Sequence, residues 1–236
     1  MSGEQVVRTE VPERKNYADY REDLRHDFWY TCAYCSLAES EATGIRFEID
    51  HYWPKEHFPQ LQARYENLYY ACGKCNGYKS DYFPNERAKS RGHRFVKVDE
   101  ESPLDHVTAD GDRLEPRTSV GEFNIHKLNL NRRALRRLRE LRRRMYDSRI
   151  VIAHGLRSLF QKRLDDYHDH SDRHNFFALR ARLLRQAKEH EKNVEELLRE
   201  RLHAPMVDPE LRNSSESKDR QRFLKEIGAI APRKRQ

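Results

Sequence analysis

Two short cysteine pairs constrain this sequence most. Cys32 and Cys35 are separated by two residues, and Cys72 and Cys75 repeat that spacing further along the chain. Each pair can present two thiolates on one side, and two such pairs complete the tetrahedral four-sulfur set of a structural zinc site. Sulfur then fills every ligand position, so this zinc would support folding and would not activate water. The spacing predicts a structural Zn²⁺; four free buried cysteines are the alternative.

The composition limits how much apolar core the 236 residues can build. Charged residues make up 36% of the chain, the same share as the hydrophobic residues. This balance favours a small metal-stabilised core with long solvated helices over a single thick core. The sequence therefore predicts an α+β fold, in which a small zinc-stapled part precedes a mostly α-helical accessory region.

The net charge of +7 is concentrated in one segment. Residues 127–164 hold 13 Lys and Arg against two acidic residues, so this segment carries +11 and the rest of the chain −4. Concentrated basic charge is typical of proteins with a polyanion partner, nucleic acid first. A solvated helix face and an acidic protein partner are the alternatives.

The N-terminus gives no sign of export or membrane insertion. Its residues MSGEQVVRTE lack the apolar stretch of a signal peptide. No run of about 18 apolar residues predicts a membrane span. We therefore expect a cytoplasmic protein with no membrane partner. Thiols stay reduced there, which favours a metal over disulfides for the four cysteines.

Hydrophobic periodicity predicts the secondary structure. Short strands are expected near residues 45–50, 68–71 and 94–98, and a hairpin turn at Asp110-Gly111. Helices are expected over residues 15–29, from about 131 to a loop at 165–172, from 172 to 202, and near 218–227. The two long helices should pack as an antiparallel pair, and Gly155 should weaken or break the first.

These elements suggest five regions. They are a flexible N-terminus (1–14), a zinc-containing core (15–92), a β-hairpin connector (93–126), a basic helical accessory domain (127–205), and a linker with a short helix and a basic tail (206–236).

Several polar residues lie between and just after the cysteine pairs, in the stretches EIDHYWPK, YENLYYACGKCN and GYKSD. They combine an Asp-His pair before a proline, an Asn-Leu, a Cys-x-x-Cys-Asn and a Lys-Ser-Asp. Over about residues 30–83 this pattern resembles the HNH endonucleases. The resemblance implies a ββα-metal finger held by the four-cysteine zinc site.

The resemblance also implies roles for particular residues. His51 would be the general base that takes a proton from the attacking water. Asp50 and Asn76 would bind a catalytic Mg²⁺ or Mn²⁺, while Asn67 would hold the loop that aims His51. Histidine suits the base role because its pKa lies near neutrality, and oxygen ligands suit a hard cation. A solvated turn is the alternative for Asp50-His51.

Basic residues are candidates for nucleic-acid contact. Lys55 or Lys79 could steady the charge on a phosphate. A run of arginines on the first long helix could hold the phosphate backbone, with little reading of the bases. This run comprises Arg132, Arg133, Arg136, Arg137, Arg139, Arg142, Arg143 and Arg144.

Three hypotheses for the function follow. The first is a metal-dependent HNH endonuclease that hydrolyses DNA phosphodiester bonds, with RNA as another substrate and with bacterial or phage defence or restriction among its contexts. The second is a nuclease subunit that stays inactive until a partner ATPase or sensor protein binds its helices. The third is a zinc-stapled module that binds nucleic acid without cutting it. The sequence does not specify the oligomeric state.

Overall fold

The structure is a computed structural model and describes residues 6–42, 44–161, 170–203 and 215–229. The chain divides into two compact units. One unit comprises Met1–Arg136 with Met206–Gln236, and the other comprises Arg137–Pro205. The boundary between them falls inside a long helix. Within the described residues, no helix combines the length and the apolar character needed to cross a bilayer.

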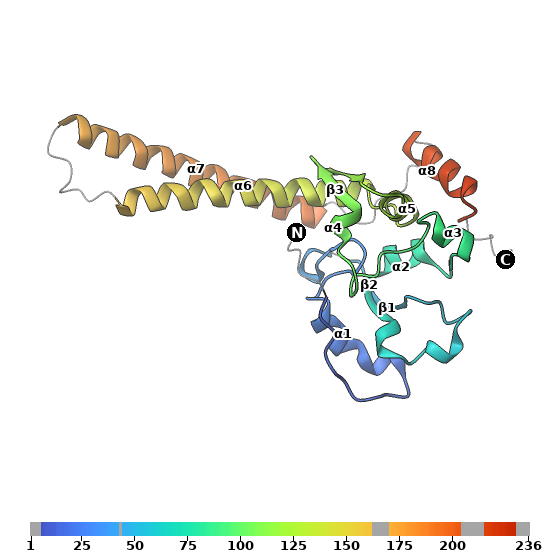
Figure 1. Cartoon of the computed structure of the whole chain (residues 1–236). Helices are drawn as coiled ribbons and strands as arrows, with labels where there is room; N and C mark the ends of the chain where they lie inside the picture. The colour runs from blue at the N-terminus through green and yellow to red at the C-terminus, as the bar shows by residue number, and fades with distance from the viewer. Residues whose placement is uncertain (1–5, 43, 162–169, 204–214, 230–236) are drawn as a thin grey trace. The chain divides into compact units, whose positions relative to one another are not determined.

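A β-hairpin followed by a helix forms the centre of the first unit (Figure 1). Strand β1 (Phe47–His51) pairs antiparallel with β2 (Leu68–Cys72), and α2 (Gly73–Lys79) follows directly. The register sets Phe47 opposite Cys72 and His51 opposite Leu68. All five residues of β2 are buried, which explains its unbroken apolar and aromatic sequence.

Short helical segments surround this hairpin and close its core. They are the 3₁₀ turns η1 (Tyr17–Tyr20), η2 (Glu39–Glu41), η3 (Pro59–Leu61) and η4 (Tyr65–Asn67), and helix α1 (Arg21–Asp27). Helix α1 contacts β2 and buries Leu24, and Phe28 directly after the helix is buried as well. The core is rich in aromatic rings, since Tyr20, Tyr69 and Tyr70 are also buried.

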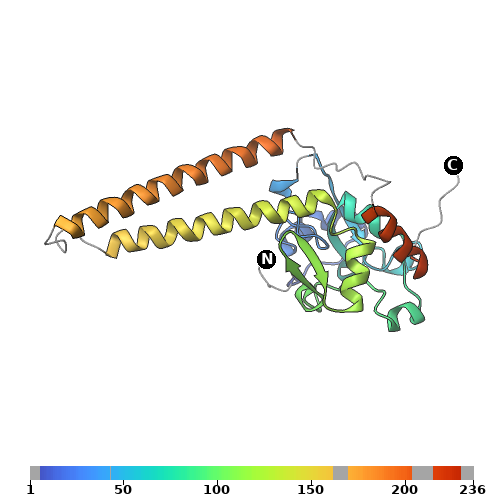
Figure 2. The same ribbon diagram turned by 90° about the horizontal axis from the view of Figure 1, so that it is seen from above.

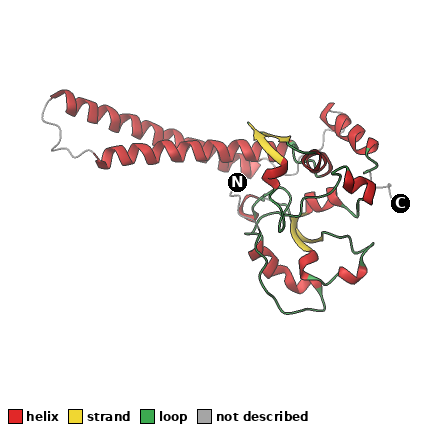
Figure 3. Ribbon diagram, viewed as in Figure 1, coloured by secondary structure: helices red, strands yellow, loops and turns green. Residues whose placement is uncertain are grey.

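A second small sheet lies in the same unit, and Figure 3 shows both sheets in yellow. Its strands β3 (Val107–Asp110) and β4 (Arg113–Pro116) form the predicted hairpin, in which Gly111 has a φ of 59°. The helices around it are α3 (Glu86–Ser90), α4 (Pro103–His106), α5 (Ser119–Lys127) and α8 (Ser215–Glu226). Helix α5 packs closely against the C-terminal end of α4, because a Cβ at Gly121 would lie 1.9 Å from the carbonyl oxygen of His106.

The second unit consists of two long helices. Helix α6 (Arg133–Gln161), which begins in the first unit, and α7 (His170–His203) run antiparallel, as Figures 1 and 2 show. Gly155 does not break α6. Its missing side chain makes room for α7, because a Cβ there would lie 1.8 Å from Leu183 Cδ2. Several large apolar side chains of this unit are exposed, among them Tyr146, Leu156, Phe177 and Leu184.

Two predicted segments look different in the structure. The N-terminal segment predicted to be flexible contacts the core, because Arg8 lies over the rings of Phe28 and Tyr69 and donates to the carbonyl of Leu68 at 2.8 Å; residues 1–5 lie outside the described part. The expected strand at 94–98 is irregular chain. The short helix predicted near 218–227 is present as α8, which packs on α5 and buries Leu224.

The predicted boundary of the helical domain also moves. The sequence places it at residue 127, whereas the contacts place it after Arg136. Residues 127–136 stay with the first unit because α5 and the start of α6 pack there, burying Lys127, Leu128, Leu130 and Leu135.

Candidate functional site

The four cysteines come together in the first unit. Their sulfur atoms all lie within 4.8 Å of one another, and the Sγ atoms of Cys35 and Cys72 are 3.9 Å apart. Zinc–sulfur bonds of about 2.3 Å in a tetrahedron place the sulfurs about 3.8 Å apart. The cluster therefore has the donors and the spacing for a metal such as zinc, as the sequence predicted.

Local backbone geometry explains how each pair presents its sulfurs. Cys32 lies in a tight turn, in which Ser36 donates to the Cys32 carbonyl at 2.9 Å and adopts a φ of 55°. Cys72 ends β2, and Cys75 lies in the first turn of α2. Gly73 stands between them, where a Cβ would lie 3.3 Å from the carbonyl oxygen of Arg46. A side chain at this position would therefore have to displace its neighbours by a few tenths of an ångström.

Arg132 contacts the cysteine cluster, contrary to the expectation that it binds nucleic acid. Its Nη2 lies 3.7 Å from Cys75 Sγ and 4.0 Å from Cys35 Sγ, and its Nη1 donates to the Asn129 carbonyl at 3.2 Å. Nearby sulfur charge raises the pKa of Arg132 against the opposing effect of burial. A four-thiolate zinc centre carries net negative charge, which this guanidinium would balance.

Asp50 is engaged in a buried ion pair. Its Oδ1 lies 3.1 Å from Lys79 Nζ, and its Oδ2 accepts a hydrogen bond from the hydroxyl of Tyr34. Asp50 is 5% exposed and Lys79 is fully buried. Burial raises the pKa of the Asp50 carboxyl, and the charge of Lys79 opposes that rise.

Two predicted roles are therefore corrected. Lys79 is enclosed, so it does not reach a nucleic acid; its Nζ instead donates to the Asp50 carboxylate and to the His51 carbonyl at 2.7 Å. Asp50 does not share an open cation site with Asn76 in this arrangement. The pair ties α2 to the end of β1, which fixes the backbone at His51.

His51 is the last residue of β1, and its ring is 8% exposed. Its Nε2 lies 3.0 Å from the carbonyl oxygen of Gln62, and the Tyr17 ring packs against it edge-on with centroids 4.8 Å apart. A carbonyl can only accept, so Nε2 carries the hydrogen and Nδ1 keeps a lone pair while the ring is neutral. Burial lowers the pKa of His51 below its usual range, which favours that neutral form at neutral pH.

Asn67 holds the segment that follows His51. Its Oδ1 accepts from the Trp53 amide at 2.8 Å, and its Nδ2 donates to the carbonyls of Trp53 at 3.1 Å and Leu61 at 3.2 Å. The residue is buried, so these hydrogen bonds are shielded from water. Asn67 thus closes the loop 52–66 against the start of β2, and that loop contains Gln62, the acceptor for His51.

Asn76 pairs with a residue that the sequence analysis did not select. Its Nδ2 donates to Glu48 Oε2 at 2.6 Å, and Glu48 is exposed. Side chains alternate along a strand, so Glu48 and Asp50 project from one face of β1 and His51 from the other. That alternation was visible in the sequence EIDH and was the signal that could have identified Glu48. Tyr34, the partner of Asp50, had no comparable signal.

The remaining basic candidates lie in different surroundings. Lys55 is half-buried, with its Nζ 5.7 Å from the centroid of Tyr17. Three arginines of α6 form ion pairs with acidic residues: Arg136 with Asp112 at 2.9 Å, and Arg137 and Arg144 with Glu140 at 2.7 and 2.6 Å. Arg133 and Arg143 are exposed, while Arg139 and Arg142 are half-buried.

The fold and the site define a mixed α and β protein with a four-cysteine cluster, in which a buried histidine of fixed tautomer ends a short hairpin. Over 100 residues, the chain is 25% identical to the Septu protein PtuB of Bacillus thuringiensis. The match spans 42% of this chain and 36% of that protein, so the likeness is partial. No protein-family model matches the chain, and no solved structure matches it.

Proposed function

We propose that the chain is a metal-dependent endonuclease of the HNH class, which hydrolyses DNA phosphodiester bonds with His51 as the general base. The observation that best supports this role for His51 is the hydrogen bonding and protonation of its ring. Its Nε2 is committed to the Gln62 carbonyl, and burial keeps the ring neutral. Nδ1 is then a proton acceptor of fixed direction, as activation of an attacking water requires.

Oxygen donors near the opposite face of β1 suit a hard cation. Glu48 and Asn76 offer a carboxylate and an amide oxygen at the surface, and they already lie within hydrogen-bond distance of each other. They would hold a Mg²⁺ or Mn²⁺ that keeps most of its waters. When bound, such an ion neutralises charge on the phosphate. In this proposal Asp50 supports the site through Lys79 and is not itself a ligand.

The reaction requires the phosphate to reach both His51 and the cation. In-line displacement places the attacking and leaving oxygens on opposite sides of the phosphorus. A phosphate bound at the end of β1 would therefore have His51 beside its attacking water and the cation on Glu48 and Asn76 beside its leaving oxygen. Lys55, close to Tyr17 and His51, would add positive charge there.

Arg133, an exposed arginine of the first unit, would hold a further phosphate of the same DNA. We also propose a role in bacterial or phage defence. The resemblance to HNH endonucleases allows that context, and the partial similarity to a Septu protein favours it.

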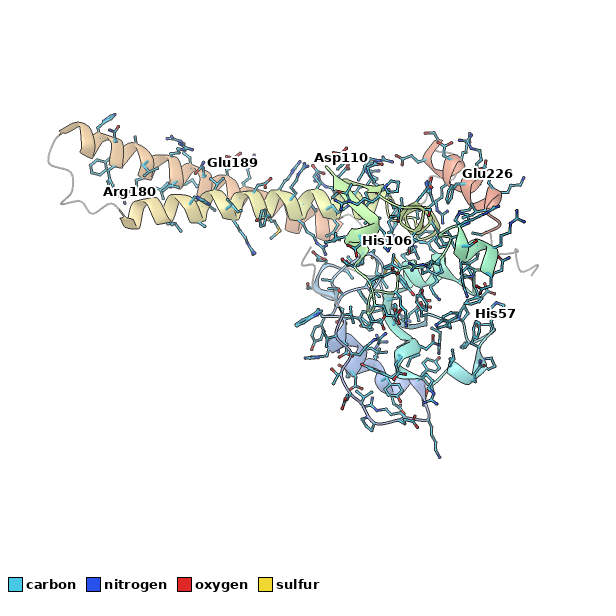
Figure 4. All side chains as sticks on the ribbon, in the orientation of Figure 1. His57, His106, Asp110, Arg180, Glu189 and Glu226 are labelled. Carbon is cyan, nitrogen blue, oxygen red and sulfur yellow. The ribbon has the colours of Figure 1, made fainter. Side chains whose placement is uncertain are left out.

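Plasmid cleavage in Mg²⁺ or Mn²⁺ tests the proposal. We expect wild type to cut and His51→Ala to lose roughly 10²–10⁴-fold in rate while keeping its fold. His57→Ala is the matched control, because His57 is an exposed histidine of the same loop (Figure 4). Cutting that survives His51→Ala would refute the base assignment. DNA binding without any cutting, under all these conditions, would indicate a non-cutting nucleic-acid-binding module or a nuclease subunit that a partner must activate.

A second candidate is a nuclease subunit that a partner protein, such as an ATPase or a sensor, activates. The exposed apolar side chains of α6 and α7 favour it, because Leu156, Phe177 and Leu184 are 46%, 54% and 57% exposed. In that case the purified chain binds DNA without cutting it. Cutting should then appear on addition of extract from the native host, and it should disappear when the added chain carries His51→Ala.

A further inference from the structure

A cavity of about 600 Å³ opens next to the residues that follow His51 in the chain. Its walls include Trp53 from that turn, Tyr82 and Phe83 from the segment after α2, and Lys89 from α3. The volume lies within the roughly 300–1,000 Å³ typical of small-ligand sites. The proposed function assigns no role to this cavity.

Aromatic rings form much of the wall. The centroids of Trp53 and Phe83 are 4.9 Å apart, and Phe58 packs edge-on against Phe83 at 4.7 Å. Tyr82 is braced from behind by Phe123, with centroids 5.5 Å apart. Rings held this firmly offer flat apolar faces, and such faces stack on nucleobases of any sequence.

The charges around the rings favour an anionic ligand. Lys89 Nζ lies 5.2 Å from the Trp53 centroid and 4.9 Å from the Phe83 centroid. The two carboxylates in the wall are each paired: Glu101 with Arg94 at 2.8 Å, and Glu100 with Lys97. Three cations against two acids leave the lining with a net positive charge. A nucleobase attached to a phosphate backbone fits this cavity, because the nucleobase can stack on the rings and the phosphate is attracted by the positive charge.

The cavity wall and His51, the proposed general base, belong to one rigid turn. Two residues span at most about 7 Å, so the Cα atoms of His51 and Trp53 lie within that distance. Asn67 fixes both the amide and the carbonyl of Trp53, and the Tyr52 hydroxyl donates to the Phe95 carbonyl at 2.9 Å. A strand with its phosphate at His51 would thus bring a neighbouring base to the cavity.

We propose that this cavity binds one unpaired nucleobase of the DNA strand held at His51, and this inference rests on the proposed function. Bases inside a duplex are paired and stacked, so they cannot enter unless they are turned out. The cavity therefore selects single-stranded DNA, or duplex DNA with a displaced base, over intact duplex.

Tryptophan fluorescence tests this directly. The chain has two tryptophans, and Trp29 is 63% exposed, so Trp29→Phe leaves Trp53 as the sole reporter. Binding is measured without added divalent cation, so that no strand is cut. The probes are a short oligothymidylate, the same strand annealed to oligoadenylate, and an abasic strand of equal length. Of these three probes, we expect only the single-stranded oligothymidylate to quench the fluorescence of Trp53.

A substitution gives the second measurement, in which the anisotropy of a dye-labelled strand reports binding because the variant lacks Trp53. Trp53→Ala should weaken oligothymidylate binding by about 5- to 150-fold and leave abasic binding unchanged, because only base stacking is lost. If Trp53→Ala does not fold, Phe83→Leu is measured in its place. Equal affinity for the abasic strand, or unchanged affinity in the folded variants, would overturn the inference. If oligothymidylate quenches Trp53 but no cutting depends on His51, the cavity still binds a nucleobase and the proposed nuclease function is refuted.

Discussion

Replacing Asp50 by asparagine separates a structural role from a ligand role. The substitution keeps the shape of the side chain and removes its charge. The ammonium of Lys79, which is fully buried 3.1 Å from Asp50, then loses its counter-charge. Removing one partner of a buried ion pair costs about 3–5 kcal/mol, because the other charge remains desolvated. We therefore expect Asp50→Asn to lower the free energy of unfolding by about that amount.

Urea unfolding at pH 7 with zinc present, monitored by tryptophan fluorescence, measures this change in the free energy of unfolding. Both tryptophans lie in the first unit, so the signal reports the unit that contains the pair. The double variant Asp50→Asn/Lys79→Met should recover part of the loss, since it buries no lone charge. Glu100→Gln is the control: Glu100 pairs with Lys97 and is largely exposed, so its loss should cost less than about 1 kcal/mol.

The decisive result is the behaviour of the single variant. An Asp50→Asn protein within about 1 kcal/mol of wild type, with an unchanged dependence on urea, would show that the pair contributes little. The reasoning that makes Asp50 a structural residue would then be refuted, and Asp50 would again be a candidate cation ligand.

Three further expectations concern packing, metal and pH. Gly121→Ala should destabilise the first unit by about 1–3 kcal/mol, because the new Cβ would lie 1.9 Å from the His106 carbonyl oxygen; urea unfolding measures it. Arg132→Met should weaken zinc binding about 10- to 100-fold, because the cluster loses its neighbouring guanidinium; competition with a chromophoric chelator measures it. Burial lowers the pKa of Lys127 to about 8, from 10.5 when unfolded. The unfolded chain therefore binds more protons between these values, and stability should rise by about 3 kcal/mol from pH 8 to 10.5 in wild type but not in Lys127→Met.

Each expectation has its own contrary result. Gly77→Ala, where a new Cβ meets nothing within 4 Å, should be neutral or stabilising, and equal costs at Gly77 and Gly121 would contradict the packing argument. Arg133→Met should leave zinc affinity unchanged, so a similar loss in both arginine variants would point to a general charge effect. Parallel pH curves for wild type and Lys127→Met would assign the pH dependence to other groups.

The sequence predicted the features that depend on local spacing. Two Cys-x-x-Cys pairs suffice to predict a cluster, because each pair fixes two sulfurs within one turn. The alternation of Phe47 and Ile49 located β1, and Asp110-Gly111 located the turn between β3 and β4. These signals lie within a few residues, where backbone geometry leaves few choices.

The features that the sequence missed depend on distant contacts. Lys79 and Asp50 are 29 positions apart, and nothing in either neighbourhood shows that the lysine points inward. Arg132 begins a run of similar arginines, yet its guanidinium contacts the cysteine sulfurs. Arg8 looked like part of a polar terminus, although it lies over core rings. Charge patterns do not reveal which member of a run is buried.

The pH dependence of single-turnover plasmid cleavage tests most directly whether His51 accepts the proton. We expect the rate to be level at and above pH 7 and to fall about tenfold per unit below the lowered pKa of His51, because only the neutral ring can act. The residual rate of His51→Ala should not show this fall at low pH. A wild-type rate that keeps rising about tenfold per unit from pH 7 to 9 would contradict the assignment, since a group other than His51 would then be losing the proton.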